Sequence, residues 1–260
     1  MIPRLIPALT IVDEKLVRTK MFKNPSYVGD PINAVKIFNE KGADELIVFD
    51  IGRDKNIRSR EGLFFLQSIA DRAFMPLAYG GGLSDIDDAR AVIDSGYDKL
   101  VISCRQVINH GFQLIEETAR LFGSQSVAVA IDVDQNIFGA PKLRGQPWYK
   151  RIKNVEEFAR NFVKAGAGEL IVRDIARCGV NRGPNLDLLQ SVSSSVEVPV
   201  VCAGGIRDME DVNHAILAGA HSVSASNFFV YHGNRNAVLI TYPERSQLDT
   251  ILGVYSGSNI

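Results

Sequence analysis

Two glycine pairs in this sequence stand where a backbone could bind an anion. Gly81-Gly82 and Gly204-Gly205 each follow a short apolar run and precede an amphipathic segment. Glycine lets the backbone approach an anion closely, and the N-terminus of a following helix adds positive potential. A single pair would be explained better by a tight turn. Because two pairs occur in the same setting, the sequence favours two phosphate-binding loops.

A hydroxyl group accompanies each glycine pair. Ser103 and Ser226 end the apolar runs that follow the two pairs, and a serine hydroxyl can donate to a phosphate oxygen. Two such sites on opposite sides of one opening suit an elongated ligand with a phosphate at each end.

A carboxylate ends another apolar run. Asp132 closes VAVAID, where burial is costly unless the group is used or paired. As a site residue it would be a general acid or base, and the alternative is that it caps the following loop. IPALT aligns with AVAID, so Thr10 takes the corresponding position in the first half of the chain.

The chain contains its central pattern twice. Residues 75–103 and 198–226 align at a shift of about 123, and each reads as strand, Gly-Gly turn, helix, strand. Residues 42–51 and 166–175 align at nearly the same shift. Two repeats with one offset predict a fold made of two like halves.

Apolar runs and amphipathic segments alternate along the chain. We expect strands at 4–12, 45–51, 76–80, 99–103, 127–133, 169–175, 199–204 and 221–226. We expect helices near 31–41, 60–72, 85–95, 111–122, 154–165, 184–194 and 208–218. This alternation predicts an α/β fold, a (β/α)8 TIM barrel with a two-fold half-barrel repeat, as a single domain over 1–260. An open doubly wound sheet is the alternative fold, and two separate domains remain possible on length alone.

Two long segments are expected to be loops. Residues 13–31 are polar, carry Arg18, Lys20 and Lys23, and read as a binding loop or lid, and residues 134–153 form a second long loop. The active site of such a barrel lies at the carboxyl ends of its strands, which is where the glycine pairs, Thr10 and Asp132 fall.

Charged residues open four of the expected strands, at the opposite end of the barrel. These residues are Arg4, Glu45, Lys99 and Glu169. They are either a solvated rim or a ring of salt bridges that closes the lower end of the barrel, and their spacing leaves both open.

Composition excludes several classes of protein. A net charge of -1 in 260 residues argues against general affinity for nucleic acid or an anionic membrane. The three cysteines form no CxxC, so we expect no metal site and no disulfide framework. The first residues do not read as a signal peptide, no apolar run is long enough to span a membrane, and a reducing cytoplasm fits. We expect no cofactor.

Beyond these patterns, the sequence resembles the HisF family, the cyclase subunit of imidazole glycerol phosphate synthase. The resemblance extends to about residue 230 and is carried by RLIPAL, GDPINAV, DELIVFDI, DKLVIS, FGSQSVAVAID, GAGELIV and the two glycine loops. It implies a (β/α)8 barrel that receives ammonia from a glutaminase subunit at its N-terminal face. The ammonia would reach a mouth where two aspartates and two phosphate sites act on a bis-phosphorylated aminoimidazole precursor.

The resemblance also assigns roles to residues. It implies an ammonia gate formed by the four charged residues above, with Asp98 at the glutaminase interface and Asp132 as a catalytic aspartate. It adds Cys104, Gly179 and Asn227 to the glycine pairs and serines of the phosphate sites.

The sequence departs from the family at the mouth. Thr10 replaces the other catalytic aspartate, and threonine cannot exchange a proton near neutral pH as a carboxylate does. VISC at 101–104 replaces the SINT of the family, ARCG at 176–179 replaces DRDG, and Asn227 stands where a serine is usual.

This combination, with the gate kept and the mouth altered, resembles a subfamily found with bacterial surface-polysaccharide genes. It implies a barrel that, with a glutaminase, supplies ammonia to a sugar amidotransferase making acetamidino sugars. The alternative is a genuine cyclase of histidine biosynthesis, and a phosphosugar isomerase that uses no ammonia is a third possibility.

Overall fold

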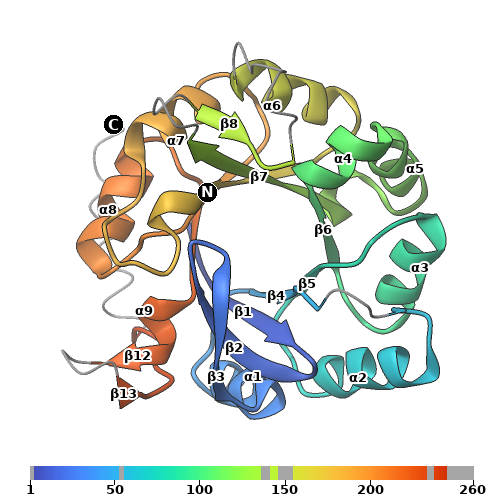
Figure 1. Ribbon diagram of the computed structural model, residues 1–260, viewed down its shortest axis with the longest axis vertical. Helices are drawn as coiled ribbons and strands as arrows, with labels where there is room; N and C mark the ends of the chain where they lie inside the picture. The colour runs from blue at the N-terminus through green and yellow to red at the C-terminus, as the bar shows by residue number, and fades with distance from the viewer. Residues whose placement is uncertain (1–2, 53–55, 136–140, 146–154, 233–236, 245–260) are drawn as a thin grey trace, which may run out of the picture.

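A computed structural model describes residues 3–52, 56–135, 141–145, 155–232 and 237–244. Within these residues, eight parallel strands form a closed barrel. They are β1 (Arg4–Val12), β4 (Leu46–Asp50), β5 (Leu77–Gly80), β6 (Lys99–Ser103), β7 (Val127–Gln135), β9 (Glu169–Asp174), β10 (Val200–Ala203) and β11 (Ser222–Ala225). The barrel closes where β11 pairs with β1, from Arg4 opposite Ser222 to Pro7 opposite Ala225 (Figure 1). The predicted (β/α)8 fold is confirmed.

Helices surround the barrel. They are α1 (Pro31–Glu40), α2 (Arg60–Ala70), α3 (Ile86–Asp94), α5 (Gln113–Phe122), α6 (Val155–Lys164), α7 (Leu186–Ser193) and α8 (Met209–Leu217). The half-barrel repeat appears in their caps: Asp85 accepts the N–H of Asp88 at the start of α3, and Asp208 accepts that of Asp211 at the start of α8. An aspartate at this position satisfies an N–H that the helix itself leaves unpaired. None of the described helices is long and apolar enough to cross a bilayer.

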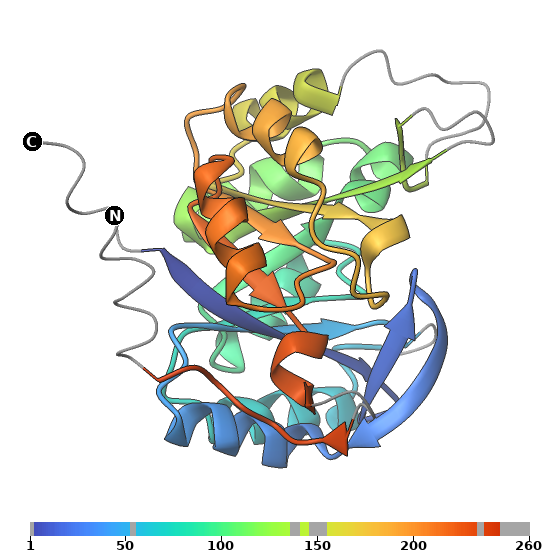
Figure 2. The same cartoon turned by 90° about the vertical axis from the view of Figure 1, so that its left-hand side faces the viewer.

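The segment expected as a loop over 13–31 is instead mostly a β-hairpin. β2 (Lys15–Lys20) and β3 (Lys23–Gly29) are antiparallel, and β2 extends the sheet from the end of β1. Met21 and Phe22 form its tip with φ of 49° and 60°, the left-handed pair that a tight hairpin turn requires. Figure 2 shows this blue hairpin at the end of the barrel toward which β1 runs.

The structure also contains several short elements that the sequence did not predict. Helices α4 (Cys104–His110) and α9 (Asn227–Val230) follow β6 and β11 directly, at equivalent places in the two halves. β8 (Pro141–Leu143) pairs with the end of β7, and β12 (Tyr231–His232) pairs with β13 (Ala237–Val238). Two 3-10 turns, η1 (Ser124–Ser126) and η2 (Ile175–Arg177), complete the order. Much of the predicted 134–153 loop lies outside the described residues.

The barrel has an outer and an inner apolar layer. The outer layer packs the strands against the helices, and the inner layer fills the barrel axis with a separate cluster. This inner cluster consists of Ile6, Ile47, Ala78, Val101, Ala128, Ala130, Ile171, Val201 and Ala203, with Phe49 packed against it. Four of its members are alanines and the others are isoleucine or valine, so the axis is apolar between the two polar ends.

Candidate functional site

The four charged residues at the lower end of the barrel form an alternating ring. Arg4 contacts both Glu45 and Glu169 through its two terminal nitrogens. Lys99 Nζ lies 3.0 Å from Glu45 and 2.7 Å from Glu169. Each carboxylate therefore lies between two cations, which is the salt-bridged arrangement and not the solvated rim.

Both carboxylates of the ring are buried, with Glu45 3% and Glu169 5% exposed. Burial works to lower the pKa of Arg4, but the attraction of Glu169 and Glu45 outweighs it and the pKa is raised. Arg4 Nε also donates to Ser222. Asp98 is exposed beside the ring, and its carboxylate accepts the backbone N–H of Leu77 at 2.8 Å.

At the upper end of the barrel, Asp132 forms a bidentate ion pair with Arg173. The two nitrogens of Arg173 lie 2.6 and 3.1 Å from the two carboxylate oxygens. Burial works to lower the pKa of Arg173, but the attraction of Asp132 outweighs it and the pKa is raised. Asp132 is 3% exposed, so it cannot take a proton from a ligand unless this pair opens.

Arg173 is also enclosed by aromatic rings. Its guanidinium carbon lies 4.5 Å from the ring centroid of Phe49 and 5.0 Å from that of Phe22, at the hairpin tip. Such contacts stabilise a cation further when water is excluded. Sequence reasoning missed Arg173, although β7 and β9 are neighbours and pair Asp132 with Arg173 in register. The sequence signal that could have revealed this ion pair is the presence of opposite charges near the ends of two adjacent strands.

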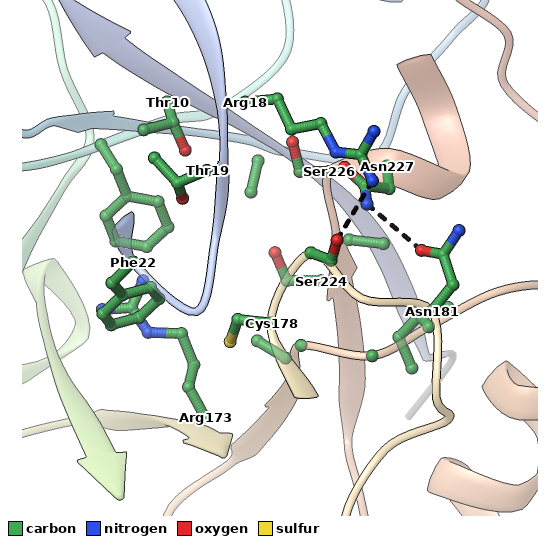
Figure 3. A pocket seen from close by; sticks show the side chains of 18 residues that line it. Thr10, Arg18, Thr19, Phe22, Arg173, Cys178, Asn181, Ser224, Ser226 and Asn227 are labelled. Atoms are coloured by element: carbon green, nitrogen blue, oxygen red, sulfur yellow. Dashed lines mark hydrogen bonds between the residues drawn. The ribbon is translucent and has the colours of Figure 1, made fainter. Parts of the chain in front are cut away.

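A pocket opens at the mouth beside this ion pair. It is lined by the second-half glycine loop, the ends of β10 and β11, and the hairpin (Figure 3). Among the predicted site residues it includes Thr10, Gly179, Gly204, Gly205, Ser226 and Asn227. Arg173 lines it but Asp132 does not. Thr10 is thus on the pocket wall, whereas the predicted acid or base lies behind the arginine.

The predicted phosphate-site residues of the first half lie outside this pocket: Gly81, Gly82, Ser103 and Cys104. The Ser103 hydroxyl accepts the N–H of Arg105 and caps α4. Cys104 is fully buried, and burial raises the pKa of its thiol to about 12. A buried neutral thiol that contacts the N–H of Asp132 at 3.4 Å is badly placed to bind a phosphate.

Two of the glycines are also required by packing. A Cβ on Gly81 would lie 2.0 Å from the carbonyl oxygen of Asp50, and one on Gly205 would lie 2.2 Å from that of Gly183. Both glycines have positive φ. Close backbone contact therefore accounts for glycine at these positions independently of an anion.

The hairpin brings a second arginine to the pocket. Arg18 donates to the carbonyl of Gly179 at 3.1 Å and lies 4.7 Å from the ring centroid of Tyr231. Its Nε is buried without a hydrogen-bond partner. A hydrogen bond from the backbone N–H of Met21 to the carbonyl of Cys178 holds the tip of the hairpin in place. Sequence reasoning noted Arg18 in a polar loop but did not assign it to the site.

Among the described residues, no group of three or more His, Cys, Asp or Glu side chains is arranged to hold a metal ion. Cys178, at the pocket wall, has the pKa of its thiol raised to about 12 by burial. Among the described residues that line the pocket, the charged side chains are Arg18 and Arg173, and the chemistry they can supply is anion binding.

Comparison with known proteins agrees with this architecture. Residues 4–235 match the model of a family described as "Histidine biosynthesis protein". A Pseudomonas aeruginosa protein named "Putative imidazole glycerol phosphate synthase subunit hisF2" is 37% identical over 250 residues, which cover 95% of this chain and 98% of that protein. A Leptospira borgpetersenii protein named "Putative imidazole glycerol phosphate synthase subunit HisF" is 34% identical over 257 residues, covering 96% and 98%. An Exiguobacterium sibiricum "Imidazole glycerol phosphate synthase subunit HisF" is 32% identical over 228 residues, covering 87% and 90%.

Proposed function

The chain belongs to the histidine biosynthesis protein family as a HisF-like barrel, and from that premise we propose that it conducts ammonia from a glutaminase subunit to its mouth. The ammonia then serves a sugar amidotransferase in surface-polysaccharide synthesis and is not used for cyclisation in this chain. In this proposal the glutaminase docks at the N-terminal face and a phosphorylated small molecule binds at the mouth.

The observation that carries the proposal is the contrast between the two ends of the barrel. The lower ring of Arg4, Glu45, Lys99 and Glu169 is complete. Above it, the barrel axis carries apolar side chains, four of them alanines, which offer a neutral ammonia molecule no strong binding partner. At the upper end Thr10 has no acid or base function, and Asp132 is held by Arg173. Delivery is thus supported and cyclisation is not.

A genuine cyclase of histidine biosynthesis is the second candidate. Asp132 is present toward the carboxyl end of β7, and the glycines of both pairs have positive φ. For this function the Arg173–Asp132 pair would have to open and another group would have to replace the acid or base missing at Thr10. The two candidates differ in the product formed at the mouth.

Docking of the glutaminase can be tested at an exposed aromatic residue. Phe74 is 86% exposed and lies just before β5, on the same end of the barrel as Asp98. Exposed aromatic side chains often contribute a large part of the binding energy at interfaces. We expect Phe74→Ala to weaken binding of a HisH-type glutaminase from the same organism at least tenfold, measured by calorimetry.

Phe64 provides the matched control, because it is 74% exposed but lies on the outer face of α2. Phe64→Ala should change the dissociation constant less than about twofold. Equal effects of the two substitutions, or no binding of the glutaminase by the unmodified protein, would contradict docking at the N-terminal face.

A further inference from the structure

We propose that the mouth accepts a ligand with one phosphate group, bound by the second-half glycine loop, and excludes a ligand with phosphates at both ends. This inference rests on the proposed binding of a phosphorylated ligand at the mouth and specifies its class. The two glycine loops occupy equivalent places in the repeat but have different surroundings. The inference follows from that difference.

The hydroxyl groups of the two halves are used differently. Ser103 and Ser226 both directly precede a helix, but Ser103 caps α4 by accepting the N–H of Arg105 at 3.2 Å. Ser226 makes no capping hydrogen bond to α9, and it lines the pocket. Only the second-half hydroxyl is therefore placed to meet a ligand in this pocket.

The cations beside the two loops are also used differently. Arg18 lines the pocket near Ser226 and Asn227 (Figure 3), and its buried Nε has no hydrogen-bond partner. A phosphate oxygen would supply a strong acceptor for such a donor. Beside the first-half loop, Arg58 lies 3.0 Å from Asp88, 3.2 Å from Asp85 and 3.6 Å from Asp87. Arg58 is thus engaged by carboxylates, and beside the second-half loop Arg207 is engaged in the same way by Asp211, so Arg18 is the cation that distinguishes the two halves.

Side chains further cover the first-half loop. A Cβ on Gly82 would lie 3.3 Å from Cδ1 of Ile57, which is buried. Gln106, on α4, donates to the carbonyl of Ser84 at 3.4 Å. The first-half loop is thus in contact with both Ile57 and Gln106.

A wall of three side chains lies on the side of the pocket toward Gly80, at the end of β5. Phe49 lines the pocket and approaches within 3.3 Å of where a Cβ on Gly80 would lie. Arg173 lies against Phe49, and Phe22 lies against Arg173. Val101, in place of a polar side chain, fills the space beside Gly80. A ligand that spanned the mouth would have to displace this stack and the ion pair of Asp132 within it.

The number and place of phosphate sites can be measured with inorganic phosphate. We expect titration of the full-length ¹⁵N-labelled protein to shift the backbone amide signals of Gly204, Gly205 and Ser226 in a saturable way. The signals of Gly81, Gly82 and Ser103 should not respond. Calorimetry should give one site per chain.

The repeat supplies a matched pair of variants. Ser226→Ala should weaken phosphate binding roughly tenfold, because it removes a hydrogen bond to a charged group. Ser103→Ala should leave the phosphate affinity unchanged, and the amide spectra of both variants report whether they are folded. If Ser226→Ala is unstable, Arg18→Met tests the same site with the same expected loss.

Two saturable sites, equal responses of the two loops, or no saturable binding would each overturn this inference. The test does not depend on ammonia transfer, since phosphate titration requires neither the glutaminase nor glutamine. If the glutaminase fails to dock but phosphate binds at a single site, the proposed ammonia conduit is overturned and this inference stands.

Discussion

We expect Lys99→Met to lower the free energy of unfolding by about 3–5 kcal/mol, measured by urea denaturation. Lys99 is shared by two buried carboxylates, at 3.0 Å from Glu45 and 2.7 Å from Glu169. Methionine fills similar space without charge, so the two anions would keep only Arg4 between them. The large effect arises because buried charges are left uncompensated, and not because an ion pair is intrinsically strong.

Lys36→Met is the matched control, since Lys36 is exposed on α1. It should change stability by less than about 0.5 kcal/mol. A loss at Lys99 as small as that of the control would mean that water or movement of the glutamates relieves the ring. The closed geometry on which the proposed gate rests would then not persist in solution.

The second large effect is expected at the mouth, where Arg173→Met should also cost about 3–5 kcal/mol of folding stability. Arg173 makes a bidentate pair with Asp132, whose side chain is nearly inaccessible. Removing the guanidinium leaves an anion buried beside Phe49 and Phe22. Urea denaturation of the variant and the unmodified protein measures this loss.

A double-mutant cycle with Asp132→Asn identifies the cause. Adding Asp132→Asn to Arg173→Met should restore part of the lost stability, because the unpaired charge is then absent. Arg160→Met, at an exposed position of α6, controls for loss of an arginine. Additive losses at Arg173 and Asp132 would contradict a coupled pair, and Asp132 would then be free to act as a base.

The barrel could be predicted because its signals are repeated and local. Eight apolar runs and two copies of one strand–turn–helix pattern indicated closure into two like halves, and Asp85 and Asp208 begin equivalent helices. The hairpin was predicted as a loop because its strands are largely polar. Its strand pairing with β1 is a tertiary contact that composition does not show.

The site could be predicted only in part, because the repeat does not show how the side chains of each half are packed and hydrogen-bonded. The glycines and serines of both halves matched, and two equivalent phosphate sites followed from them. The structure separates the halves through packing of Phe49 and Val101 and through the use of Ser103 as a cap. Arg173 could not be assigned from the sequence of β9 alone, because the run of apolar residues that precedes it indicates only a buried strand. The lower ring was found because all four charges open strands, which fixes them at one end of the barrel.

Cyclisation of the bis-phosphorylated aminoimidazole precursor of histidine, with ammonia as the nitrogen source, distinguishes a conduit from a cyclase. The pure protein and an ordinary cyclase of the family are assayed side by side for imidazole glycerol phosphate. We predict turnover at least about 100-fold below that of the ordinary cyclase, because Thr10 supplies no acid or base and Arg173 holds Asp132. Turnover close to that of the ordinary cyclase would contradict the conduit and establish the mouth as a working cyclase site.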